Sequence, residues 1–329
     1  MNKFIGFAIL IGLFFITPLV VKPQIKKANG SLFEKVKQSS ENQLKKDTNL
    51  FRIPTPGQIK AWQFITESIL KNRLSDAQQM INQLSFPYQL TLFTDKESKR
   101  EYVLLEENYP LLAGWGFYVF DLNSKNSLVL EIPHPVFDGN TEFQGIDAFL
   151  QTGAKAYLLA GAHRRTNTQD TPCTQPKSSR EDANYPVSDV AHAVATPFHA
   201  VHETLVKEIP TTVAVQLHGM GGRDICPNAF MSTGSKTVTT NSKKLLSCLT
   251  QKGVEAEIYD GNTSCPLNAL SNVQGRFSNG ETKNPCRNNV KTSPEPGNFI
   301  HIEQEPVLRK NRESWQPVIE ALKCAFPLN

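Results

Sequence analysis

The sequence lacks several short motifs that mark common enzyme classes. It has no GxSxG nucleophile elbow, no GxxxxGK[ST] phosphate loop, no GxGxxG after a predicted strand and no HExxH helix. It also has no dense basic block, and the formal net charge is only +4 over 329 residues. These absences argue against the corresponding serine-hydrolase, nucleotide-binding and zincin mechanisms, and nucleic acid is not expected as a partner.

Long apolar runs are also rare, and the one that occurs lies at the N-terminus. About eighteen mostly apolar residues, 4–21, follow one lysine and precede three others. This pattern is typical of an export signal. The run is short for a bilayer span and no Ala-x-Ala cleavage site follows, so residues 1–22 are predicted to be a signal peptide or a membrane anchor. We expect a periplasmic or extracellular protein, either secreted or tethered to the membrane.

Cysteine is scarce, and every cysteine lies in the second half of the chain. An even count in an exported protein favours disulfide bonds, and the absence of a CxxC pair argues against a cysteine zinc site. The loop-rich stretch from Cys226 to Cys286 is expected to be part of the cross-linked region. The six cysteines are Cys173, Cys226, Cys248, Cys265, Cys286 and Cys324.

Hydrophobic patterning divides the rest of the chain into three parts. Residues 23–56 are polar and predict a tether, and residues 57–110 predict an extension of amphipathic helices followed by a strand pair. In residues 111–329, apolar strands alternate with helices, which predicts a three-layer αβα sandwich with a mostly parallel or mixed central sheet. One long helix is expected over residues 187–209. Strands are expected near residues 114–121, 126–134, 154–163, 211–219, 255–261 and 297–305.

Four predicted strands end in polar residues. In open α/β sheets, ligands bind at the carboxyl ends of the strands, so these endings predict one common site. His134, an acid close behind it, and His218 could supply three zinc ligands and leave a position for water. Glu303 could then accept the proton of that water, with Glu305 as the alternative on the same strand face. The endings are His134, the segment HRRTN at 163–167, His218, and the pair Glu303 and Glu305.

Further candidates lie on HRRTN and on the predicted helix 187–209. Arg164 or Arg165 could neutralise a substrate carboxylate or an oxyanion, and Asn167 is a candidate for substrate binding beside them. His192 and His199 are seven residues apart and would share a helix face. That face could hold substrate, support the metal ligands or form a second metal site, or it could be an ordinary solvated surface.

These motifs resemble the zinc-dependent αβα hydrolases related to carboxypeptidases, and most closely the poly-γ-glutamate hydrolases and N-formylglutamate amidohydrolases. The resemblance implies a phosphorylase/hydrolase-like, zinc-peptidase-like fold and Zn²⁺ as cofactor. It also implies zinc ligands at His134, Asp138 and His218, Glu303 as general base, and Arg164 or Arg309 as the partner of a substrate carboxylate. The motifs are His134, Asp138 and Thr141, the sequence LHG at His218, and EQEPVLR from Glu303 to Arg309.

The chain departs from this family pattern directly after His134. The poly-γ-glutamate enzymes have a glycine-rich turn and a glutamate there, whereas this chain has Pro135, Val136, Phe137 and an aspartate. Glu142 therefore remains an alternative acidic ligand to Asp138.

The expected function is zinc-dependent hydrolysis of an amide or peptide bond, in a carboxylate-bearing substrate, by a monomeric exported enzyme. The substrate could be a small molecule, a peptide or a cell-wall component. The stretch HPVFDGNTEFQG is also similar to the HGGxDxGAxG opening of cell-wall N-acetylmuramoyl-alanine amidases, which gives an alternative. A catalytically silent protein that binds peptide or glycan on the same fold is the remaining alternative.

Overall fold

A computed structural model describes residues 24–84, 87–110, 113–173, 185–222 and 224–328. The predicted signal or anchor at residues 1–22 lies outside these ranges. Within them, no helix combines the length and apolar character needed to cross a membrane. The strands are β1 (Lys26–Gly30), β2 (Tyr88–Asp95), β3 (Glu101–Glu107), β4 (Phe117–Phe120), β5 (Leu128–Ile132), β6 (Ala156–Leu159), β7 (Val213–Gly219), β8 (Ala229–Ser232), β9 (Ala256–Ile258) and β10 (Phe299–Gln304).

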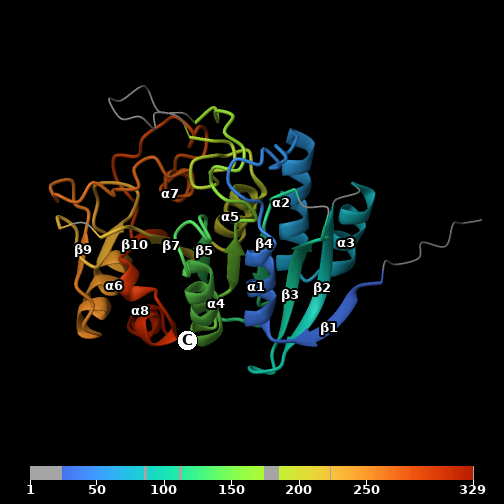
Figure 1. Ribbon diagram of the computed structural model, residues 1–329, viewed down its shortest axis with the longest axis horizontal. Helices are drawn as coiled ribbons and strands as arrows, with labels where there is room; N and C mark the ends of the chain where they lie inside the picture. Colours follow the sequence, from blue (N-terminus) through green and yellow to red (C-terminus); the bar gives the residue numbers. More distant parts are fainter. Residues whose placement is uncertain (1–23, 85–86, 111–112, 174–184, 223, 329) are drawn as a thin grey trace, which may run out of the picture.

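The strands form one ten-stranded mixed sheet in the order β1-β2-β3-β4-β6-β5-β7-β10-β8-β9. In its centre, β6, β5, β7 and β10 are parallel, whereas β4 and β8 run antiparallel to their central neighbours. The central segments LVLEI and AYLL are buried along their whole length, which is why they read as continuous apolar runs. β5, β7 and β10 therefore release their following loops at one edge of the sheet (Figure 1).

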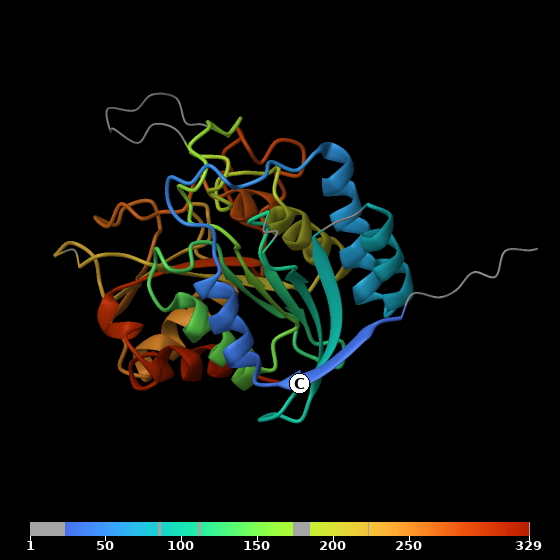
Figure 2. The same cartoon turned by 45° about the vertical axis from the view of Figure 1, so that its right-hand side comes forward.

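Helices cover both faces of this sheet, which confirms the predicted αβα class. One core lies under α1, α4, α6 and α8, and a second lies under α2, α3 and α5. Figure 2 shows the strands between these two groups of helices. The helices are α1 (Leu32–Glu41), α2 (Pro56–Leu70), α3 (Leu74–Gln83), α4 (Thr141–Thr152), α5 (Pro197–Glu208), α6 (Thr240–Gln251), α7 (Val273–Ser278) and α8 (Arg312–Ala325), with a 3₁₀ turn η1 at Pro306–Leu308.

The segment expected to be a tether is instead folded onto the domain. β1 pairs in parallel with β2, and α1 packs beside α4 with Leu32 and Val36 fully buried. Ser31 caps α1 through its hydroxyl, and Asp95 accepts the N–H of Leu32 at 2.9 Å. Leu32 and Val36 are four positions apart and share one side of the helix, and Phe33 stacks on Phe143 of α4, so a short helix is docked although the overall composition is polar. Residues 57–110 continue the same sheet and its helical cover.

The helix expected over residues 187–209 begins only at Pro197. Thr196 is its N-cap and accepts the N–H of His199 at 3.1 Å, while Pro197 occupies the first turn. Proline is well suited to that position because it has no N–H to leave unsatisfied. Residues 187–196 form turns, so His192 and His199 do not share a helix face.

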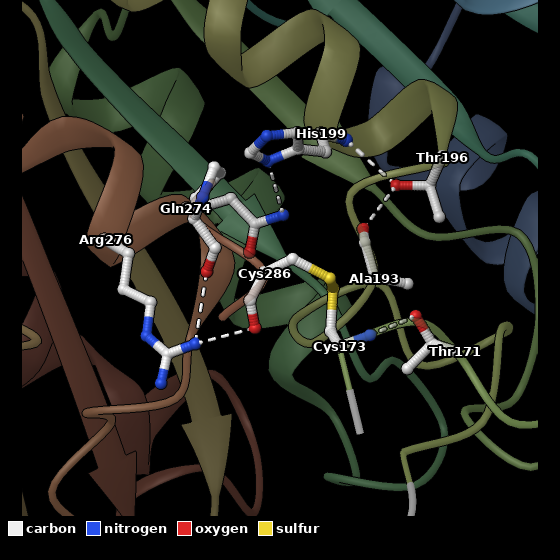
Figure 3. The surroundings of a disulfide bond; sticks show 9 residues. Thr171, Cys173, Ala193, Thr196, His199, Gln274, Arg276 and Cys286 are labelled. Carbon is white, nitrogen blue, oxygen red and sulfur yellow. Dashed lines mark hydrogen bonds between the residues drawn. A yellow bond between two sulfur atoms is a disulfide. The ribbon is translucent and has the colours of Figure 1, made fainter. Parts of the chain in front are cut away.

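The predicted disulfide bonds are present. Cys248–Cys324 joins α6 to α8, and Cys226–Cys265 links the loop after β7 to the segment after β9. Cys173–Cys286 joins the segment after β6 to the one after α7, where Arg276 donates to the carbonyl of Cys286 (Figure 3). The stretch Cys226–Cys286 is thus cross-linked as expected.

Candidate metal centre

Three buried side chains converge at the carboxyl edge of β5 and β7. The Nδ1 atoms of His134 and His218 lie 3.5 and 3.2 Å from the same oxygen, Asp138 Oδ2. All three residues are at most 3% exposed. The strand-end histidines and the acid four residues after His134 therefore meet at one point, as the sequence predicts.

The outer nitrogens of both histidines have other partners. His134 Nε2 lies 2.9 Å from Asp189 Oδ1, and His218 Nε2 lies 3.3 Å from Gln216 Oε1. Metal-binding histidines commonly have such a partner on the second ring nitrogen, because it holds the ring and its tautomer in place. In both rings the nitrogen left facing Asp138 is Nδ1.

Two atoms of this cluster are buried without a hydrogen bond. Among the described residues, Nδ1 of His134 and Oδ2 of Asp138 have no hydrogen-bond partner. An unsatisfied buried polar atom costs about 1–3 kcal/mol, so two of them in one cluster of ligand-type side chains require an explanation, and a bound ion is one. Two imidazole nitrogens and one carboxylate oxygen are a donor set typical of zinc, and a cation between them would satisfy both atoms.

The charges of the site also favour a cation. Burial alone would raise the pKa of Asp138, but its contacts with His134 and His218 hold that pKa well below its usual range. Burial and Arg164 lower the pKa of His134, yet Asp189 and Asp138 outweigh them and raise it. Burial lowers the pKa of His218 to about 4, which keeps its imidazole neutral, as a ligand must be. Two buried carboxylates thus draw positive charge to this point.

Asp189 is a functional candidate that the sequence analysis did not assign. It is fully buried and also contacts His192 Nδ1 at 3.0 Å and Arg164 Nε at 3.0 Å. Burial would raise its pKa, but Arg164 and the two histidines lower it well below the usual value. Helical spacing did not predict that Asp189 contacts His134, because residues 187–196 form turns instead of the expected helix.

The predicted general base lies beside this cluster. β10 pairs with β7 so that Glu303 is in register with His218 and His301 is in register with Gln216. His301 Nε2 lies 3.5 Å from Glu303 Oε1, and its ring centroid is 4.2 Å from that of His218. Ligand-type atoms of His218, His301 and Glu303 all lie within 4.8 Å of one another. The other candidate, Glu305, follows the end of β10 and donates its backbone N–H to Asn228.

The turn between His134 and Asp138 is closed by backbone hydrogen bonds, and the alternative acid Glu142 lies after it. The carboxyl of Glu142 is buried, which raises its pKa, and among the described residues its Oε2 has no hydrogen-bond partner. The N–H groups of Asp138 and Phe137 donate to His134 and Pro135 at 2.9 and 2.7 Å. Within the described ranges, Glu142 belongs to none of the clusters that could hold a metal, whereas Asp138 does.

Two of the three arginines expected to bind a substrate carboxylate, Arg164 and Arg309, contact the protein itself. Arg164 donates to Asp189 through Nε and Nη2, and its guanidinium lies over the ring of Phe137 at 5.3 Å. Arg309 donates to the carbonyls of Asp138, Gly139, Met220 and Gln304. Arg309 thereby ties the loops after β5, β7 and β10 together.

The remaining predicted site residues have different surroundings. Asn167 is buried, and its side-chain amide donates to the carbonyl of Phe51 at 3.3 Å. Arg165 donates its backbone N–H to His163 Nδ1 at 3.1 Å. His199 points toward Gln274 beside the Cys173–Cys286 bond (Figure 3), and burial lowers its pKa to about 3. His199 belongs to no metal-type cluster in the described part of the chain.

No family model and no curated protein matches the chain. Among solved structures, it is similar to an N-formylglutamate amidohydrolase from Ralstonia eutropha JMP134, with 13% identity, 64% of this chain and 95% of that chain covered, and a TM-score of 0.39. A bacteriophage poly-γ-glutamate hydrolase matches with 15% identity, 61% and 84% coverage, and a TM-score of 0.36. An aspartoacylase family protein from Mesorhizobium loti matches with 9% identity, 72% and 67% coverage, and a TM-score of 0.32. Both families named in the sequence analysis are thus among the solved structures to which this α/β chain is similar, at low identity.

Proposed function

We propose that the protein is a zinc-dependent hydrolase that cleaves an amide or peptide bond. The observation that carries this proposal is the convergence of His134, Asp138 and His218 on one buried point, with two polar atoms there that no other described group satisfies. A site of three protein ligands leaves a coordination position for water, which is the arrangement of catalytic zinc sites.

His134, Asp138 and His218 would hold the ion. When bound there, zinc lowers the pKa of its water and polarises the carbonyl of the substrate. Glu303, in register with His218 on the neighbouring strand, would accept the proton of the attacking water and donate it to the leaving amine. Asp189 would keep His134 turned so that Nδ1 faces the ion.

We also propose that the protein is exported. The support is the set of three disulfide bonds, Cys173–Cys286, Cys226–Cys265 and Cys248–Cys324, because such bonds persist in oxidising compartments. Together with the N-terminal apolar segment, they favour a protein that works outside the cytoplasm, secreted or held by that segment.

A matched pair of variants tests the metal centre. Asp138→Asn removes the carboxylate that faces both histidines, whereas Glu142→Gln changes a similarly buried acid that, among the described residues, belongs to no metal-type cluster. After zinc loading and gel filtration, elemental analysis should find about one zinc per chain in the wild type and in Glu142→Gln, and little in Asp138→Asn. Equal zinc content in the two variants would refute the ligand assignment. A wild-type protein without bound zinc would refute the proposed function.

A further inference from the structure

Exposed apolar side chains lie on the loops that surround the candidate metal centre. Val136 and Phe137, 47% and 51% exposed, stand on the turn between the two proposed ligands His134 and Asp138. Ile225 follows β7 and Val307 follows β10, and they are 59% and 58% exposed. Single exposed apolar residues are common, but these belong to loops at the carboxyl ends of three neighbouring parallel strands.

These loops are fixed against one another rather than merely adjacent. Arg309 donates to the carbonyls of Asp138 and Met220, and so joins the loops after β5 and β7 to the segment after β10. The N–H of Glu305 donates to Asn228 at 2.8 Å, which ties the same segment to the far end of the loop after β7. The apolar residues are therefore held at the rim of the site by a defined backbone.

Phe137 is the best placed of these residues. The edge contact with His163 has a centroid distance of 5.3 Å, and Arg164 lies over its ring at 5.3 Å. The ring centroid of the proposed ligand His134 is 6.5 Å away. A side chain supported on two sides and still half exposed beside a metal ligand offers an ordered apolar surface at the reaction centre.

The backbone at Val136 gives independent support. Val136 has φ +65°, in the left-handed region, where a β-branched residue is an outlier that costs about 1–3 kcal/mol. The N–H groups of Phe137 and Asp138 close the turn around Val136 by donating to the carbonyls of Pro135 and His134. A glycine would adopt the same φ without that cost, so the strained valine indicates that its exposed side chain contributes to function.

The contacts of the nearby arginines also favour an apolar surface beside the proposed ligands. Arg164 donates to the buried Asp189, and Arg309 donates to four backbone carbonyls. Two of the three arginines expected to receive a substrate carboxylate, Arg164 and Arg309, are thus committed within the protein. The surface that the turn 134–138 presents beside the ligands is apolar.

We propose that the substrate carries an uncharged apolar group, an aromatic or branched aliphatic side chain, next to the scissile amide, and that Phe137 and Val136 bind this group. The inference rests on the proposed function, since it names the substrate class of that site. It replaces the carboxylate-bearing substrate that the sequence motifs implied.

Two hydroxamates of equal linker length test this inference on the zinc-loaded protein. Both 3-phenylpropanohydroxamate and succinic monohydroxamate can chelate zinc, but one presents a phenyl group where the other presents a carboxylate. Isothermal titration should show the phenyl compound binding at least about tenfold more tightly, which is about 1.4 kcal/mol. Phe137→Ser should weaken that binding about tenfold and leave the succinyl compound unchanged, and Phe137→Leu should keep most of it.

The matched control is Leu84→Ser. Like Phe137, Leu84 is a partly exposed apolar residue, at 41%. It lies at the end of α3, so its replacement should change the affinity for neither compound. Equal or tighter binding of the succinyl compound, or no effect of Phe137→Ser, would overturn this inference but not the proposed function. Absence of bound zinc would overturn the proposed function, and the inference with it.

Discussion

Replacing Asp189 with asparagine probes the support of the proposed metal centre. The fully buried carboxylate contacts His134, His192 and Arg164, and an amide cannot accept from all three because its nitrogen is itself a donor. Breaking a buried ion pair costs about 3–5 kcal/mol. Since the side chain of Arg164 is 24% exposed and remains partly hydrated, we expect the lower end, about 3 kcal/mol, in urea unfolding of the zinc-free protein.

The same substitution should weaken zinc binding, because loss of a carboxylate partner behind a ligating histidine typically costs 10–100-fold in metal affinity. Competition with a chromophoric chelator would measure it.

The pH dependence of Asp189→Asn supplies a second readout. The pKa of Asp189 is depressed in the folded protein, so its contribution to stability is present above the unfolded value of about 3.9 and is lost as pH falls through the folded value. The stability difference between the wild type and the variant should thus shrink at strongly acidic pH. Part of it should also be lost as pH rises through the raised pKa of His134, because Asp189 favours the protonated imidazole. A cost below about 1 kcal/mol together with unchanged zinc affinity would refute the role given to Asp189.

Two further predictions concern the base and the strained turn. Glu303→Gln should retain zinc but lose turnover, because an amide cannot accept the water's proton; if Glu305→Gln behaves this way and Glu303→Gln does not, the base is Glu305. Val136→Asn should raise the free energy of unfolding by about 1 kcal/mol in urea titration, since asparagine tolerates φ +65° better than valine, and a loss of stability would show that the turn is not strained.

The placement of His134, His218 and Glu303 could be predicted because it depends on topology. Each follows or ends a buried strand, and parallel strands release their ends at one edge, so a strand pattern is enough to bring them together. The partners of Arg164 and Arg309 could not be predicted in this way. Arg309 donates to carbonyls that are distant in sequence, and carbonyls have no residue signature; Arg164 bonds to Asp189, whose position depends on a turn.

The N-terminal segment is folded, although its sequence predicted a tether. Residues 26–41 read as a tether because composition averages over the few buried positions, yet Leu32, Val36 and the partly buried Phe33 dock α1 beside α4. The pairing of β1 with β2 adds backbone hydrogen bonds that need no apolar side chain. Short elements at a sheet edge are stabilised by such contacts and leave a weak pattern in the sequence.

The turn after His134 connects the choice of acidic ligand with the choice of substrate. Asp138 faces both histidines because the chain reverses within residues 134–138, and that reversal needs a left-handed residue at Val136. A glycine-rich turn would supply the same geometry without strain but would present no side chain at the rim. Among the described residues, Asp138 faces both histidines, whereas Glu142 lies outside the clusters of metal-type side chains. A turn built on Val136 and Phe137 instead of glycines therefore places two apolar side chains beside the proposed zinc ligands.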